Sequence, residues 1–218
     1  MNLEGCRINF LGDSITQGCG TSLPEKRFTD IIALRYGAIC RNYGIEGTRI
    51  AVQRIPSSTP VWDQNFISRV EDMAPEADAV VVFGGTNDFG HGDAPLGTME
   101  DHTADTFYGA LHVLFTSLIN KYPESKIAMI TPLHRHNEDN PRGDGKKKEN
   151  VGTLHRYVSI ICEVAEYYSI PVLNLFAGSG LQPKVPIIRE KYVPDGVHPN
   201  DAGHEILAEK IAGFLKNL

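Results

Sequence analysis

Short apolar segments recur along the chain and are separated by longer segments with helical periodicity. The clearest is residues 79–83, Ala-Val-Val-Val-Phe, which is apolar at every position and stops at Gly84 and Gly85. A strand that is buried on both faces of a sheet has this pattern. Similar but weaker runs predict four further strands, at residues 7–11, 38–43, 126–131 and 170–175.

Three segments have apolar residues three and four positions apart, which predicts helices with one buried face. They are residues 107–122, 151–168 and 201–218, and Pro199 and Asn200 mark the start of the last one. Strands that alternate with helices predict an α/β fold in three layers, αβα, with a parallel sheet in the middle. Ligands of such sheets bind at the carboxyl ends of the strands. Chemistry is therefore expected in the loops that follow the predicted strands.

Composition and charge narrow the classes of protein without naming an activity. The 218 residues are 41% hydrophobic and 22% charged, which is ordinary for a globular protein, and we expect residues 1–218 to form a single domain. The balance of 21 basic and 27 acidic residues gives a net charge of −6, which argues against nucleic acid as a partner. A short basic run at residues 146–148 lies beside Asp144 and Glu149, and we interpret it as a solvated loop.

The sequence also indicates the cellular compartment of the protein. No apolar run is long enough for a membrane-spanning helix, and the first residues lack the pattern of a signal peptide, so a cytoplasmic protein is expected. The cysteines form neither a C-x-x-C pair nor a zinc-binding spacing and are interpreted as unpaired thiols: Cys6, Cys19, Cys40 and Cys162. The oligomeric state stays open.

Ser14 directly follows the first predicted strand, in the segment Gly12-Asp13-Ser14. A serine at such a turn can be exposed as a nucleophile, and its backbone N–H can face a developing oxyanion. Taken alone, the segment is also typical of an ordinary turn that caps a helix.

Two further strand ends carry groups of the same kind. Gly47 follows the second predicted strand, where a glycine allows a ligand to approach the backbone closely. Asn87 follows the third, in Gly85-Thr86-Asn87-Asp88, where its amide could reach an oxyanion while the neighbouring carboxylate fixes the loop. In isolation, a plain turn glycine and an Asx turn are the simpler explanations of these segments.

Asp195 precedes His198 by three residues, in a loop that ends at Pro199. A carboxylate in this place can accept the Nδ1 proton of the histidine and leave Nε2 free as a general base. A solvent-facing loop pair is the competing interpretation. Together with the strand-end residues, however, these groups supply a nucleophile, a base, an orienting acid and oxyanion donors, which is what acyl transfer requires.

The four blocks, in this order, resemble the SGNH hydrolases, a branch of the GDSL esterases and lipases named for its Ser, Gly, Asn and His. Ile15 stands where the GDSL name would have Leu, a harmless departure, and the matches run from residue 12 to residue 199. The resemblance implies a flavodoxin-like, five-stranded parallel sheet with strand order 2-1-3-4-5. It gives no reason to expect a metal or an organic cofactor.

The resemblance also implies a role for each matching residue. Ser14 would be the nucleophile, His198 the base and Asp195 its orienting partner. The backbone N–H groups of Ser14 and Gly47 and the side chain of Asn87 would form the oxyanion hole. The chain would then be a serine esterase that works through an acyl-enzyme.

Substrate specificity is harder to predict from the sequence. Residues 49–65, residues 89–103 and the polar segment after residue 134 are expected to form the walls of the site, and they carry polar side chains rather than an apolar stripe. We therefore favour short, acetyl-type acyl groups on polar or carbohydrate alcohols. The candidate substrate-binding residues are Asp13, Trp62, His134 and His136.

Several alternatives remain at this point. A lysophospholipase or thioesterase that acts on longer acyl chains has the same catalytic blocks. The fold and the loop after the first strand would also suit a non-catalytic flavin- or phosphate-binding module. His134 and His136 could form a metal pair, although incidental loop residues or contact with a ligand explain them more simply.

Overall fold

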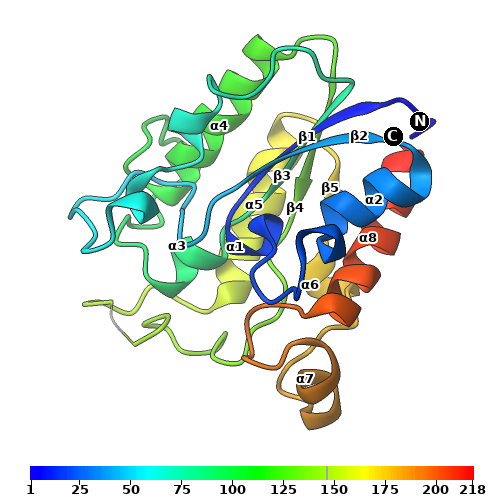
Figure 1. Ribbon diagram of the computed structural model, residues 1–218. Coiled ribbons are helices and arrows are strands. Elements are labelled where there is room, and N and C mark those ends of the chain that lie inside the picture. The colour runs from blue at the N-terminus through cyan, green and yellow to red at the C-terminus, as the bar shows by residue number, and fades with distance from the viewer. Residues whose placement is uncertain (146) are drawn as a thin grey trace.

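A five-stranded parallel sheet forms the centre of the computed structural model, which describes residues 1–145 and 147–218 (Figure 1). Its strand order is β2-β1-β3-β4-β5, so the predicted α/β topology is confirmed. The strands are β1 (Arg7–Gly12), β2 (Ile39–Gly44), β3 (Ala79–Phe83), β4 (Lys126–Ile130) and β5 (Val172–Leu173). Strand β3 lies in the centre and is buried at every position, as its uninterrupted apolar run predicts.

The fifth strand is much shorter than residues 170–175. Pro171 precedes it and lacks the N–H that a longer ladder would need. Asn174 ends it, because its side chain accepts the N–H of Ala177 and so begins helix α6 (Leu175–Gly178).

Helices cover both faces of the sheet, and Figure 1 shows α4 (Phe107–Lys121) on the opposite side from α2 (Phe28–Tyr36) and α8 (Asp201–Lys216). Helix α5 (Leu154–Tyr167) packs with α4. Alternate residues of β3 enter the two cores: Val80 and Val82 pack with α4 and α5, whereas Val81 and Phe83 pack with α2 and α8. The three long predicted helices are thus present. None of the helices in the described part of the chain is long and apolar enough to cross a membrane.

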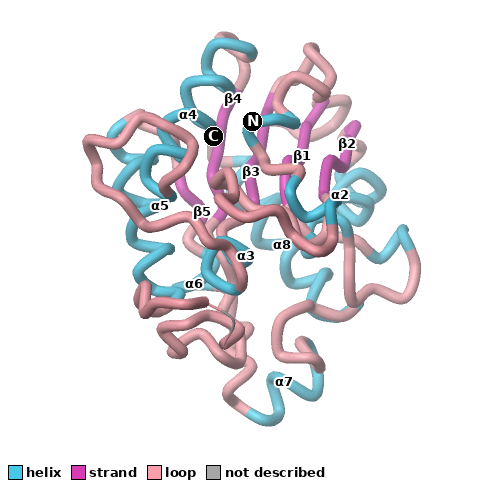
Figure 2. The backbone as a smooth tube through the Cα atoms, turned by 90° about the vertical axis from the view of Figure 1, so that its left-hand side faces the viewer, coloured by secondary structure: helices cyan, strands magenta, loops and turns pink. Residues whose placement is uncertain are grey.

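Helix α2 is the main element absent from the sequence predictions. Its buried residues, Phe28, Ile31 and Ile32, have helical spacing, but they cover only nine residues of chain without a side-chain cap. The remaining elements are short turns of helix: α1 (Ser14–Gln17), α3 (Thr86–Gly90), α7 (Pro186–Tyr192), η1 (Pro24–Lys26), η2 (Pro60–Asp63) and η3 (Ile67–Arg69). Figure 2 shows α3, α6 and α7 gathered with long loops at one end of the sheet and both termini at the other. The loop-rich end is where the strands β1, β3 and β4 finish.

His204 is fully buried between α8 and α2, where its ring stacks on Phe28 and its Nδ1 accepts the Phe28 N–H at 3.1 Å. Burial lowers its pKa from 6.5 to about 4, so the folded protein holds a neutral ring. Above pH 6.5 both the folded and the unfolded states carry that neutral ring. As the pH falls from 6.5 towards 4, the unfolded chain takes up a proton that the folded chain does not, and stability is lost.

We therefore expect His204 to destabilise the fold by roughly 3 kcal/mol between neutral pH and pH 4. In His204→Asn the amide oxygen can still accept from Phe28, but no group titrates. Between neutral pH and pH 4, the free energy of unfolding of this variant should fall less than that of the wild type, by the amount that His204 contributes. The variant nevertheless starts from a lower stability at neutral pH. Urea unfolding of both proteins at several pH values measures the difference. Parallel losses in the two proteins would contradict the assignment.

Candidate active site

Ser14 begins helix α1 at the point where β1 ends. The side chain of Asp13 caps this short helix by accepting the N–H of Ile15 at 3.0 Å. Gly12 allows the tight turn, since a Cβ there would lie 2.1 Å from Thr16 Oγ1 and 2.9 Å from the Phe83 carbonyl oxygen. This turn places the Ser14 hydroxyl at the carboxyl edge of the sheet.

His198 lies against Ser14, although 184 positions separate them in sequence. The Ser14 hydroxyl donates to His198 Nε2 at 2.9 Å, and His198 Nδ1–H donates to Asp195 Oδ2 at 2.7 Å. The first and last blocks of the sequence therefore meet in one hydrogen-bonded series. Its order, carboxylate to imidazole to hydroxyl, is the arrangement that removes a proton from a serine as it attacks.

Asp195 is held as a carboxylate. Burial alone would raise its pKa, but the hydrogen bond from the His198 ring and the backbone N–H groups of His198 and Val197 lower the pKa to about 2. Both N–H groups reach Oδ1, at 2.7 and 2.8 Å. The same carboxylate thus orients the imidazole with one oxygen and fixes its own loop with the other.

Gly47 lies in the loop after β2 and Asn87 in the short helix α3, and a hydrogen bond joins these two segments. Gly47 has a φ of +71°, a conformation that favours glycine. Asn87 Nδ2 donates to the carbonyl oxygen of Thr48, the residue after Gly47, at 3.0 Å. The next residue, Asp88, fixes the neighbouring segment, because its buried carboxylate accepts the N–H groups of Ile50 and Ala51. The second and third sequence blocks are therefore joined, and the expected role of the carboxylate next to Asn87 is present.

Arg69 is a part of this edge that the sequence did not reveal. Its buried guanidinium donates to the carbonyl oxygens of Gly12 at 3.1 Å and Tyr43 at 2.6 Å, and to Thr48 Oγ1 at 3.0 Å. Burial lowers its pKa to about 10, so it remains a cation at neutral pH. One side chain thus ties the ends of β1 and β2 to the loop of Gly47. No local pattern marks an arginine whose partners are distant backbone carbonyls.

The polar segment after β4 differs from the solvated loop expected around residues 146–148. Lys146 lies outside the described residues, but Lys147 is buried, and its Nζ donates to the Asp88 carbonyl oxygen at 2.6 Å and to the Tyr157 hydroxyl at 2.9 Å. Burial lowers the pKa of Lys147 to about 8. The interpretation of the basic run as wholly solvated was therefore wrong at Lys147.

A physical reason for this burial is the unsatisfied end of helix α3. The last carbonyl groups of a helix need donors from elsewhere. Residues 134–145 and Lys147 supply donors to this helix: Lys147 to the Asp88 carbonyl oxygen, Arg135 to that of Thr86 at 3.1 Å, and the Asp144 N–H to that of Gly90 at 2.7 Å. We call residues 134–145 together with Lys147 the strap. The strap holds the helix that carries Asn87.

The candidate substrate-binding residues lie in different surroundings. Trp62 lies against Gly47, where a Cβ would be 2.1 Å from the indole. His136 borders the loop of Asp195, because its N–H donates to the Gly196 carbonyl oxygen at 2.8 Å. His134 faces elsewhere: Nδ1 contacts Glu138 Oε2 at 2.7 Å and its ring packs on Phe176.

Asp13 is buried with its carboxylate on the N–H of Ile15. Burial raises its pKa to about 6. Asp13 thus caps the helix that begins at Ser14.

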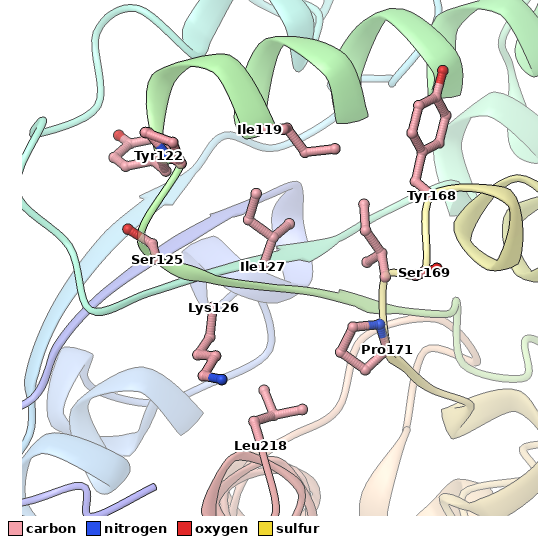
Figure 3. A pocket seen from close by; sticks show the side chains of 11 residues that line it. Ile119, Tyr122, Ser125, Lys126, Ile127, Tyr168, Ser169, Pro171 and Leu218 are labelled. Atoms are coloured by element: carbon pink, nitrogen blue, oxygen red, sulfur yellow. The ribbon is translucent and has the colours of Figure 1, made fainter.

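A cavity with a volume of about 350 Å³ lies at the opposite end of the sheet, where the strands begin. Figure 3 shows the side chains that line it. Its lining includes Lys126 and Ile127, where β4 begins, together with Pro171 before β5 and the C-terminal Leu218. In a parallel sheet this end is remote from the end of β1 that carries Ser14. The cavity therefore gives no room for a substrate at Ser14.

Comparisons with known proteins agree with this geometry. A family model described as the GDSL-like lipase/acylhydrolase family matches residues 10–206. No curated protein matches the chain. Among experimental structures, a protein from Lactobacillus plantarum is 30% identical, with a TM-score of 0.83 over 98% of each chain.

Two more distant structures share the fold. A lipase/acylhydrolase from Enterococcus faecalis is 20% identical, with a TM-score of 0.66 over 97% of this chain and 96% of that one. A member of the lipolytic protein G-D-S-L family from Veillonella parvula is 17% identical, with a TM-score of 0.63 over 97% and 99%.

Proposed function

The chain belongs to the GDSL-like lipase/acylhydrolase family and is therefore a carboxylic ester hydrolase, and we propose that it removes short, acetyl-type acyl groups from polar or carbohydrate alcohols. The observation that carries the catalytic part is the hydrogen-bonded series from Asp195 through His198 to Ser14. A flavin- or phosphate-binding module would give Asp195 and His198 no role. Family membership leaves that alternative without support.

In the proposed mechanism His198 Nε2 takes the hydroxyl proton as Ser14 Oγ attacks the ester carbonyl carbon. The carbonyl π electrons move to the oxygen, which becomes an oxyanion, and Asp195 stabilises the imidazolium. As the intermediate collapses, the C–O bond to the alcohol breaks and His198 donates its proton to that oxygen. Water then attacks the acyl-enzyme with His198 again as base, which releases the acid and restores Ser14.

The donors proposed for the oxyanion are the N–H groups of Ser14 and Gly47 and the Asn87 amide. Asn87 Nδ2 carries two hydrogens, and one of them is used on the Thr48 carbonyl oxygen. That bond fixes the plane of the amide and leaves the second hydrogen for the substrate. A donor held in place before the reaction costs no reorganisation when charge develops.

The preference for short acyl groups rests on what surrounds Gly47. The Trp62 indole lies against this glycine and is held there, because Arg49 donates to the Trp62 carbonyl oxygen at 3.0 Å and pairs with Asp63 at 2.6 Å. A rigid aromatic wall beside the oxyanion hole limits the room for a long chain and offers a face for a sugar ring. His91 packs on the Trp62 ring, which makes this side of the site partly polar.

A series of p-nitrophenyl esters from acetyl to palmitoyl tests this preference. We expect kcat/KM to be highest for acetyl to butyryl and to fall for longer chains, since each further methylene would have to find space beside Trp62. Trp62→Ala should make kcat/KM depend less on acyl length. Tyr167→Ala, on the exposed face of α5, should leave that dependence unchanged. A maximum at octanoyl or beyond in the wild type would instead favour the lysophospholipase or thioesterase alternative.

Covalent capture tests the catalytic assignment independently of acyl length. A fluorophosphonate probe should label Ser14, and mass spectrometry of the digested protein locates the adduct. Labelling of another residue, or an active protein without any label, would contradict the assignment.

A further inference from the structure

His91 directly follows helix α3 and lies between two loops of the site. Its Nε2 is 3.1 Å from the carbonyl oxygen of Gly47, and its Nδ1 is 3.7 Å from Asp144 Oδ2. The ring also packs on Trp62, with ring centroids 4.8 Å apart. None of the four sequence blocks contains His91, and the proposed mechanism gives it no role.

The direction of the contact with Gly47 follows from the groups involved. A carbonyl oxygen only accepts hydrogen bonds, so His91 must carry its proton on Nε2 to hold Gly47. At Nδ1 the ring faces the carboxylate of Asp144, 3.7 Å away. Asp144 therefore contacts the ring nitrogen that does not face Gly47.

Asp144 is itself fixed by the strap. The Arg135 guanidinium pairs with Oδ1, Asn137 Nδ2 donates to the same oxygen at 2.8 Å, and the Asp144 N–H is bound by Gly90. Burial would raise the pKa of Asp144, but the contacts with His91, Arg135 and Asn137 lower it to about 2. The carboxylate behind His91 is therefore charged and immobile at neutral pH.

Gly47 needs such support. Glycine has a wide choice of backbone conformations, and the direction of the Gly47 N–H depends on its φ of +71°. Within the turn around it, the Thr48 N–H donates to the Ile45 carbonyl oxygen in a long hydrogen bond of 3.4 Å, and the Thr48 hydroxyl donates to the same oxygen. The bond from His91 fixes the carbonyl side of the same glycine.

We propose that His91, backed by Asp144, is a positioning residue that holds Gly47 so that its N–H points at the oxyanion. The proposal rests on the proposed function, in which Gly47 is an oxyanion donor. His91 would touch neither the substrate nor Ser14. Its effect would therefore be on kcat, through a misplaced donor, rather than on substrate binding.

The test compares His91→Phe, which keeps a ring for Trp62 but has no donor, with His91→Gln, which keeps a side-chain N–H. With p-nitrophenyl acetate we expect His91→Phe to lower kcat by about tenfold or more at a nearly unchanged KM, since it misplaces an oxyanion donor. His91→Gln should recover most of that loss. His155→Phe, at an exposed histidine near the start of α5, is the matched control and should keep wild-type kcat.

Asp144→Asn supplies a second test through coupling. If Asp144 acts on Gly47 only through His91, Asp144→Asn should lower kcat when it is made in the wild-type protein. The same substitution should have little further effect when it is made in the His91→Phe protein. Melting temperatures of all variants separate positioning from loss of structure. Equal losses of kcat in His91→Phe and His91→Gln, with equal falls in melting temperature, would overturn the proposal.

Fluorophosphonate labelling keeps the two proposals distinguishable. Wild-type protein labelled away from Ser14 would refute the proposed function. Normal labelling at Ser14 together with an undiminished kcat in His91→Phe would refute only the role of His91.

Discussion

Ser14→Ala should lower kcat for p-nitrophenyl acetate by about 10⁴- to 10⁶-fold, to the level left by binding and the oxyanion donors alone. The hydroxyl that donates to His198 Nε2 at 2.9 Å is the proposed nucleophile, and alanine has no atom that can form the acyl-enzyme. Initial rates with the purified variant, corrected for the reaction in buffer, measure the loss. Melting temperature should change little, because only one oxygen atom is removed.

The matched control is Ser179→Ala. Ser179 stands between Gly178 and Gly180, and its hydroxyl oxygen accepts the Leu181 N–H at 3.1 Å, within a turn after α6. It should keep wild-type kcat. His198→Ala should lose about as much as Ser14→Ala, and the double variant should lose no more than either, because the two groups act as a unit. Equal activity of wild type and Ser14→Ala would refute the serine mechanism.

The sheet and the long helices were predictable because they rest on local patterns. The apolar run of β3 and the three-four spacing of α4, α5 and α8 are visible in short windows, and burial followed as the patterns predict. Helix α2 was missed because its pattern is brief, and β5 was overestimated because the apolar run hides the effects of Pro171 and Asn174.

Within the site, the residues of the four blocks could be predicted because Ser14, Gly47 and Asn87 lie in short glycine-containing segments after strands, and Asp195 and His198 lie in a loop that ends at Pro199. Arg69, Lys147 and His91 could not, since their partners are backbone carbonyl groups far along the chain. The position of such a carbonyl depends on the folded loop and not on the residue type that carries it. Sequence patterns therefore predict the reacting groups better than the groups that hold them.

The supporting residues hold the segments that carry Gly47 and Asn87, which are proposed as oxyanion donors. Arg69 binds the loop of Gly47 from below the sheet edge, the strap binds α3, and Asp88 binds residues 50 and 51. Arg69, Arg135 of the strap and Asp88 are all buried, and each forms hydrogen bonds with backbone groups. Their shared effect is to fix the segments that carry the donors proposed for the oxyanion, and oxyanion stabilisation requires fixed donors.

Asn87→Ala should lower kcat by about 10²- to 10³-fold, the loss that follows removal of one oxyanion donor, with KM close to that of the wild type. The physical reason is that the Asn87 amide gains importance only when the carbonyl oxygen becomes negative. Asn87→Asp should be at least as impaired, because a carboxylate cannot donate and repels the oxyanion. Asn217→Ala, which removes an exposed side chain at the end of α8, is the matched control.

Fluorophosphonate labelling distinguishes this loss from damage to the nucleophile. Asn87→Ala should still be labelled at Ser14 with one adduct per chain, but more slowly, since the probe also develops negative charge on an oxygen. A kcat within about threefold of wild type in a folded Asn87→Ala protein would show that the amide contributes less than an oxyanion donor does. Its bond to the Thr48 carbonyl oxygen would then be its main role, and the stabilisation of the oxyanion would fall to the Ser14 and Gly47 N–H groups.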